Sequence, residues 1–190
     1  MGIEKKIILL LGGARSGKSS FAQELAKKSA AKVLFVATAS AGDEDMRQRI
    51  QKHRQGRPAS WRTLEASDHL GHQIEEHVGD AQLVVIDCIT LLVNNLFGHY
   101  DEKQFETLDD SILEQQVAEE IGELQACLKN LGASFIIVSN ELGLGVVPDN
   151  RTARLFRDIL GRTNQRLAQS ADEVYLMVAG IPLELKPARG

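Results

Sequence analysis

The 190-residue sequence predicts a single α/β domain of three layers, in which helices flank a mainly parallel β-sheet. Two observations support this fold class. The apolar segments are short and continuous rather than alternating, which is typical of parallel strands that are buried on both faces. Stretches with helical spacing separate these segments, as right-handed βαβ connections require. The expected strands cover residues 6–11, 32–37, 83–88, 134–139 and 173–178.

The connecting elements are less uniform. The clearest helix follows steps of four and three residues that keep one apolar stripe facing the sheet. Its members are Leu113, Val117, Ile121, Leu124, Leu128 and Leu131. The C-terminal segment "GIPLELK" predicts a last strand, antiparallel and at an edge. Residues 40–70 are strongly polar, and we expect them to form an excursion from the sheet edge.

Composition limits the possible function classes. A net charge of −4 argues against broad nucleic-acid binding, although a local basic patch can still hold a phosphorylated small molecule. Cys88 and Cys127 form no metal-ligand pattern, so we interpret them as reduced core residues. The sequence contains no apolar run long enough for a membrane anchor and no signal peptide. These observations predict a cytoplasmic protein.

The stretch "GGARSGKS", residues 12–19, matches the phosphate-binding pattern G-x-x-x-x-G-K-[ST] directly after the first expected strand. Its backbone N–H groups would surround a phosphate, Lys18 would reach the β and γ oxygens, and Ser19 would bind Mg²⁺. The alternative interpretation of this motif is a glycine-rich turn that binds no ligand. We favour nucleotide binding because a strand precedes the motif and a helical stretch follows it.

Asp87 ends the third apolar run, where a carboxylate would emerge near a metal ion bound to the nucleotide. The alternative is an aspartate that only caps the next turn.

His53 lies in "RIQKHRQGRPASWR", residues 49–62, a stretch with several cations and no acidic residue. The cations would keep the imidazole neutral and attract a triphosphate. The residues alone leave two interpretations open. His53 is either a nucleophile for an anionic substrate or a polar residue on a solvated helix.

Taken together, these motifs resemble those of the bifunctional adenosylcobinamide kinase / adenosylcobinamide-phosphate guanylyltransferase family, the CobU type. The matching stretches are "GGARSGKS", "VATAS", "RIQKHRQGRPASWRTLE", "IDCIT", "SNELGLGVVPDNR" and "GRTNQRLAQSADEVYLMVAGIP". The resemblance implies a RecA-like P-loop fold. It also implies phosphorylation of the aminopropanol hydroxyl of adenosylcobinamide by ATP or GTP. GMP would then pass from GTP to adenosylcobinamide phosphate through a guanylylated histidine, giving adenosylcobinamide-GDP and pyrophosphate.

The resemblance also implies roles for individual residues. His53 would be the guanylylated nucleophile, Lys18 would act in catalysis, and Ser19 and Asp87 would hold the metal. The nucleotide contacts would be Gly12, Gly13, Ala14, Arg15, Ser16, Gly17, Lys18, Ser19, Ala37, Thr38, Ala39, Arg54, Gln55, Gly56, Arg57, Glu65 and Asp87. A homo-oligomer, with a trimer suspected, would be the functional unit.

Other readings of the sequence stay open. A monofunctional P-loop kinase would use His53 only to bind phosphate, and a P-loop regulatory ATPase would use the basic segment to contact nucleic acid. The glycines of "ELGLGVVP" belong to a mobile loop over the corrinoid or to an ordinary connection. For the remaining candidates we favour structural roles: solvated arginines on a helix, surface histidines and a packing tryptophan. These are Arg151, Arg154, Arg162, His69, His72, His77 and Trp61.

Overall fold

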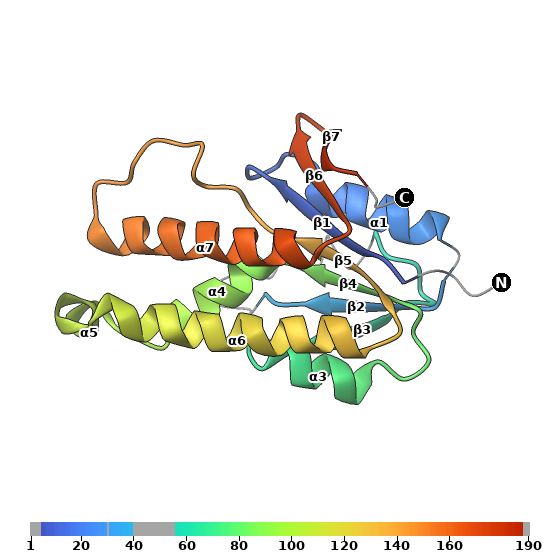
Figure 1. Cartoon of the computed structure of the whole chain (residues 1–190), viewed down its shortest axis with the longest axis horizontal. Helices are drawn as coiled ribbons and strands as arrows, with labels where there is room; N and C mark the ends of the chain where they lie inside the picture. The colour runs from blue at the N-terminus through green and yellow to red at the C-terminus, as the bar shows by residue number, and fades with distance from the viewer. Residues whose placement is uncertain (1–4, 30, 40–55, 188–190) are drawn as a thin grey trace.

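A computed structural model describes residues 5–29, 31–39 and 56–187, and these residues form a sheet flanked by helices (Figure 1). The strand order is β3-β2-β4-β5-β1-β6-β7, and all neighbours are parallel except β6 and β7. The strands are β1 Ile7–Gly12, β2 Val33–Ala37, β3 Arg62–Glu65, β4 Leu83–Asp87, β5 Ser134–Val138, β6 Glu173–Val178 and β7 Ile181–Lys186. The helices are α1 Lys18–Lys28, α3 Leu70–His77, α4 Ile89–Phe97, α5 Glu102–Thr107, α6 Asp110–Asn130 and α7 Arg151–Ser170.

The predicted three-layer fold with a mainly parallel sheet is confirmed. Each of the five expected strands is present within one residue of its predicted bounds, and β7 is the expected antiparallel edge strand. The apolar stripe predicted for residues 113–131 lies on α6. One element was missed: β3 lies within the polar segment that we expected to leave the sheet. It pairs in parallel with β2 and forms the opposite edge of the sheet.

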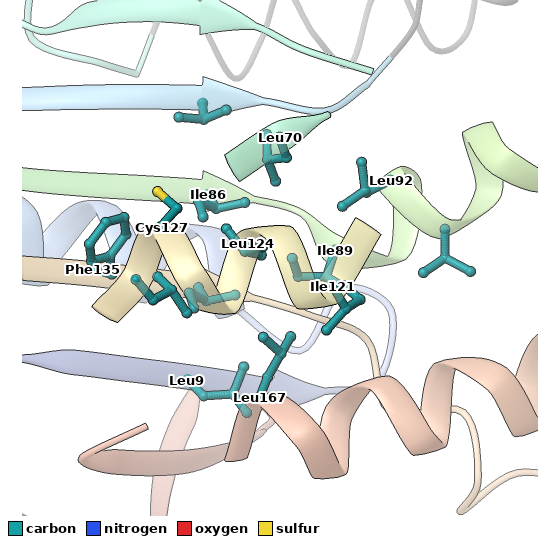
Figure 2. Packing of buried hydrophobic residues seen from close by; sticks show 14 of the residues in the cluster. Leu9, Leu70, Ile86, Ile89, Leu92, Ile121, Leu124, Cys127, Phe135 and Leu167 are labelled. Carbon is teal, nitrogen blue, oxygen red and sulfur yellow. The ribbon is translucent and has the colours of Figure 1, made fainter. Parts of the chain in front are cut away.

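Two apolar layers hold the helices on the sheet. On one face α1 packs its buried Ala22 and Ala26 against strand residues such as Phe35. On the other face α3, α4, α6 and α7 form the larger core, in which Leu9, Leu124 and Leu167 are fully buried (Figure 2). No helix in the described part of the chain combines the length and apolar character needed to cross a bilayer.

The parallel register aligns the carboxyl ends of four strands. Glu65 of β3 pairs with Ala37 of β2, Ala37 pairs with Asp87 of β4, and Asp87 pairs with Val138 of β5. β1 ends beside β5 and runs directly into residues 13–17. Because neighbouring strands are about 4.8 Å apart, Glu65 and Asp87 begin roughly 10 Å from each other across this edge.

Two carboxylates of α6 cap the start of α3 and so fix the segment that follows Glu65. Glu120 accepts the backbone N–H of His69 at 2.9 Å and of Leu70 at 2.8 Å, and Glu123 accepts the N–H of His72 at 2.8 Å. The first N–H groups of a helix have no acceptor within it, so these carboxylates supply the hydrogen-bond acceptors that the helix lacks. Burial raises the pKa of Glu120, while the two backbone N–H groups oppose that rise.

Replacing Glu120 tests how much this cap contributes to stability. Glu120→Ala leaves two N–H groups without an acceptor, one of them on the fully buried Leu70. We expect the free energy of unfolding to fall by about 2–3 kcal/mol, as measured by urea denaturation. Glu120→Gln keeps one acceptor oxygen and should lose roughly half as much. The control Glu119→Ala, at an exposed neighbour, should stay within about 0.5 kcal/mol of wild type. Equal stability of all variants would contradict the role of the cap.

Candidate functional site

The phosphate-binding segment lies in the predicted place, between the end of β1 and the start of α1 (Figure 1). Two of its glycines are required by the backbone. Gly12 has φ +148° and Gly17 has φ +99°, conformations that side chains rarely adopt. A Cβ on Gly12 would lie 2.6 Å from the carbonyl oxygen of Met177, and one on Gly17 would lie 3.0 Å from the Cα of Gly180. A further bond, from the N–H of Gly180 to the carbonyl of Ser16 at 2.9 Å, holds the segment against the β6–β7 turn.

Lys18 turns its amine into this loop. The Nζ atom donates to the carbonyl of Gly12 at 2.9 Å and of Gly13 at 2.6 Å, and it lies 3.4 Å from the Ser16 hydroxyl. The residue is only 6% exposed. Burial lowers the pKa of Lys18, and the nearby Cys88 and Asp87 partly offset that effect. A bound phosphate would supply the negative charge that this buried ammonium lacks.

Asp87 is the second charged group that the fold brings to this place. It ends β4, and its charge raises the pKa of Lys18, so the strand-end carboxylate predicted from the sequence lies within electrostatic range of the phosphate loop. The next residue, Cys88, is half-buried, and desolvation raises the pKa of its thiol to about 11. Cys88 is therefore protonated near neutral pH and is a poor nucleophile. Both Cys88 and Cys127 are free thiols, as predicted.

Thr38 fixes the backbone beside Asp87. Its hydroxyl donates to the carbonyl of Cys88 at 2.6 Å and accepts the N–H of Cys88 at 2.8 Å. The residue is 1% exposed. In the described structure the Thr38 hydroxyl thus forms its hydrogen bonds with the protein backbone. Asn95 extends the link, because its amide donates to the carbonyls of Thr38 at 2.9 Å and Ser67 at 3.1 Å. These contacts join the segments that follow β2, β3 and β4.

The remaining predicted nucleotide contacts separate into two groups. Ala37, Ala39 and Glu65 lie at the carboxyl edge with Asp87, and Ser19 occupies the first turn of α1. Gly56 and Arg57 lie elsewhere in the described structure.

The carbonyl of Gly56 accepts the amine of Lys27, near the other end of α1 from Lys18, and the Arg57 guanidinium lies 3.5 Å above the centre of the Phe35 ring. The structure therefore does not bring these two residues to the phosphate loop. His53, Arg54 and Gln55 lie outside the described residues.

The residues that follow β5 form a set of polar contacts that the sequence did not predict. The N–H of Glu141 donates to the carbonyl of Gly12 at 2.9 Å, which joins the connection after β5 to the phosphate loop. The Thr90 hydroxyl accepts the N–H of Asn140, and Asn164 of α7 accepts the Ser139 hydroxyl and donates to the Asn140 carbonyl. The polar residues at the end of the apolar run were the available signal, but they do not reveal their partners.

Several other candidates form hydrogen bonds or ion pairs within the protein. Arg151 donates to the carbonyls of Phe105 and Leu108, and Arg154 donates to those of Pro148 and Asp149. Arg162 pairs with Glu114.

Trp61 stacks on Phe35 with ring centres 6.4 Å apart. Within the described ranges no group of three or more His, Cys, Asp and Glu side chains is arranged to hold a metal, so His69, His72 and His77 form no such site.

The assembled edge is suited to phosphate chemistry. An anion in the loop would meet backbone N–H groups, the start of a helix and a buried ammonium, with a carboxylate available for a metal ion. Ser19 and Asp87 offer oxygen ligands, which Mg²⁺ prefers. Of the predicted residues, the phosphate loop, Lys18, Ser19, Ala37, Ala39, Glu65 and Asp87 lie along the carboxyl edge of the sheet, with Glu65 at the end farthest from the loop.

Comparison with known proteins agrees with this reading. The family model described as "Cobinamide kinase / cobinamide phosphate guanyltransferase" matches residues 8–185. The protein named "Bifunctional adenosylcobalamin biosynthesis protein CobU" from Escherichia coli is 43% identical over 181 residues, and its counterpart from Salmonella typhimurium is 45% identical over 181. Each alignment covers 95% of this chain and 99% of the relative. The CobP protein of Pseudomonas aeruginosa is 39% identical, with coverage of 94% and 96%.

A solved structure from Pyrococcus horikoshii OT3 is similar in fold. It aligns with a TM-score of 0.56 at 8% identity, covering 97% of this chain and 87% of that one. At this identity the similarity concerns the fold alone.

Thr38→Val tests the link beside Asp87. Valine has nearly the same shape but neither donates to nor accepts from Cys88, so two backbone groups lose their partner. We expect the free energy of unfolding to fall by about 2 kcal/mol, as measured by urea denaturation. Thr38→Ser keeps the hydroxyl and serves as the matched control, with a smaller loss. If valine and serine give the same stability, the hydroxyl does not hold this backbone.

Proposed function

Because the chain belongs to the cobinamide kinase / cobinamide phosphate guanyltransferase family, we propose that it is a bifunctional transferase of cobalamin biosynthesis. It phosphorylates adenosylcobinamide with ATP or GTP. It then transfers GMP from GTP to adenosylcobinamide phosphate, which gives adenosylcobinamide-GDP and pyrophosphate. The observation that carries this proposal is the buried Lys18 amine bound within the phosphate loop, in electrostatic range of Asp87, in a chain that matches the family along nearly its whole length.

In the kinase step the chain mainly positions and neutralises charge. The Lys18 amine exchanges the carbonyls of Gly12 and Gly13 for phosphate oxygens, which favours its charged form. Ser19 and Asp87 would hold Mg²⁺, which would supply further positive charge to the phosphates. The N-terminus of α1 and the loop N–H groups hold the β-phosphate. This assignment follows from the oxygen ligands and the buried amine that the edge presents.

In the guanylyl step a ring nitrogen of His53 attacks the α-phosphorus of GTP. A phosphorus–nitrogen bond forms, the bond to the bridging oxygen breaks, and pyrophosphate leaves with its electron pair. A phosphate oxygen of the acceptor then displaces the histidine from GMP. Basic residues near His53 in the sequence keep the imidazole neutral and offset the charge of the leaving group. Arg54, Gln55 and Glu65 would complete the guanine-nucleotide site.

The working form of the enzyme is proposed to be a cytoplasmic homo-oligomer, a trimer by family resemblance, that does not use nucleic acid. An apolar surface on the β6–β7 hairpin supports the association of copies. Val178, Ile181 and Leu183 are each more than half exposed there, and β7 is an edge strand. Exposed apolar surface beside an unpaired strand edge is characteristic of contact surfaces.

The histidine mechanism predicts a covalent label. Wild-type protein incubated with GTP labelled at the α-phosphate should retain the label after denaturation, and it should release it as adenosylcobinamide-GDP when adenosylcobinamide phosphate is added. His53→Ala should retain none, whereas His72→Ala, which replaces an exposed histidine of α3, should label like wild type. Equal labelling of wild type and His53→Ala contradicts the mechanism. A wild type without label but with kinase activity would instead be a monofunctional kinase.

The kinase step predicts a strong dependence on Lys18. Lys18→Ala removes the buried ammonium, and we expect phosphorylation of adenosylcobinamide to fall by a factor of about 100 or more, equivalent to roughly 3 kcal/mol. The measurement is product formation from γ-labelled nucleotide. Lys28→Ala, at the exposed end of the same helix, should retain full activity. Full activity of Lys18→Ala would remove this residue from the phosphate site.

A further inference from the structure

An apolar cavity of about 600 Å³ lies beyond the phosphate loop, between α4, α5, the start of α7 and the connection that follows β5. Three phenylalanines contribute to its wall. Phe97 packs against Phe105 with ring centres 5.9 Å apart, and against Phe156 with ring centres 5.1 Å apart. Leu142 and Val146 contribute from the connection. None of these residues takes part in the phosphate site described above.

The connection that covers this cavity has an ordered backbone and uncovered apolar side chains. The Glu141 carboxylate accepts the N–H of Gly143, and the carbonyl of Leu142 accepts the N–H of Gly145. At its end, the Asn150 side chain caps α7. Yet Leu144 is 82% exposed and Val146 is 94% exposed. Apolar side chains held in the open beside an apolar cavity indicate a binding surface.

The cavity lies close to the phosphate site. The N–H of Glu141 is bonded to the carbonyl of Gly12 at 2.9 Å, and the next residue, Leu142, lines the cavity. Since consecutive Cα atoms are about 3.8 Å apart, one wall of the cavity lies within roughly 10 Å of Gly12. A ligand in the cavity therefore needs only a short arm to reach a phosphate in the loop.

The lining is chemically selective. Arg157 is its single charged member among the described residues, and its guanidinium pairs with Asp158. Amide and hydroxyl groups complete the lining through Asn94, Asn150 and Thr152. Apolar walls with a few uncharged polar groups suit a ligand whose periphery combines methyl groups and carboxamides.

We infer that this cavity binds one edge of the corrinoid ring of the acceptor, so that the aminopropanol arm extends along Leu142 toward the phosphate loop. The inference rests on the proposed function for the identity of the acceptor. A propionamide joined to aminopropanol is about as long as two to three residues of extended chain, roughly 8 Å, which matches the gap from the cavity to the loop. The ring stays at the cavity while the hydroxyl reaches the transferring phosphate.

The test uses neighbouring substitutions in the full-length enzyme. Val146→Asn removes an apolar wall residue, and Ala153→Phe fills the cavity from the first turn of α7. Val147→Asn is the matched control, because Val147 is also exposed but does not line the cavity. We expect the KM for adenosylcobinamide to rise about fivefold in Val146→Asn and more in Ala153→Phe. The KM for the nucleotide and the α-phosphate labelling by GTP should not change, and Val147→Asn should resemble wild type.

Two results would overturn the inference. In the first, the KM for adenosylcobinamide is unchanged in both cavity variants. In the second, sedimentation shows that these variants alter the number of subunits, which would make the cavity a contact between copies of the chain. Neither result bears on the proposed function, which is tested separately by phosphorylation of adenosylcobinamide and by α-phosphate labelling of the wild-type protein.

Discussion

The candidate site depends on the hydrogen bonds that the buried Lys18 amine makes within the phosphate loop. An ammonium removed from water is unfavourable unless polar groups surround it, and the carbonyls of Gly12 and Gly13 supply those groups. Both carbonyls belong to a loop whose path is set by β1 between β5 and β6. The strand order also brings Asp87 within electrostatic reach, although β5 separates its strand from β1. The strand order of the sheet therefore places the groups that act on the charge of the Lys18 Nζ atom.

Much of this fold was accessible from the sequence because its signals are local. Continuous apolar runs predicted the buried strands, and the phosphate-binding pattern predicted its own backbone shape. β3 was missed because Arg62–Glu65 contains no apolar run. As an edge strand it is mostly exposed, and it is defined by pairing with β2 rather than by burial. Propensity alone does not identify such a strand.

The candidate site was predictable only in part. Lys18 could be placed because it belongs to a motif that follows an apolar strand. Asp87 could be placed because it ends an apolar strand. The contacts of Thr38 with Cys88, and of Asn95 with Ser67, join residues distant in sequence. They exist only once the strand order is known, and a single sequence does not contain that order. Thr38 was expected to contact the nucleotide, and its side chain proves to be engaged by the protein itself. His53 and its nearest neighbours lie outside the described residues, so their role stays a prediction.

The turn between β6 and β7 also bounds one flank of the phosphate loop. Gly180 contacts the loop so closely that no side chain fits at Gly17, and its N–H is bonded to Ser16. Backbone thus closes that flank of the phosphate site. The loop is thereby held from the β6 side of β1, whereas Asp87, the other charged group of the site, lies on the β5 and β4 side.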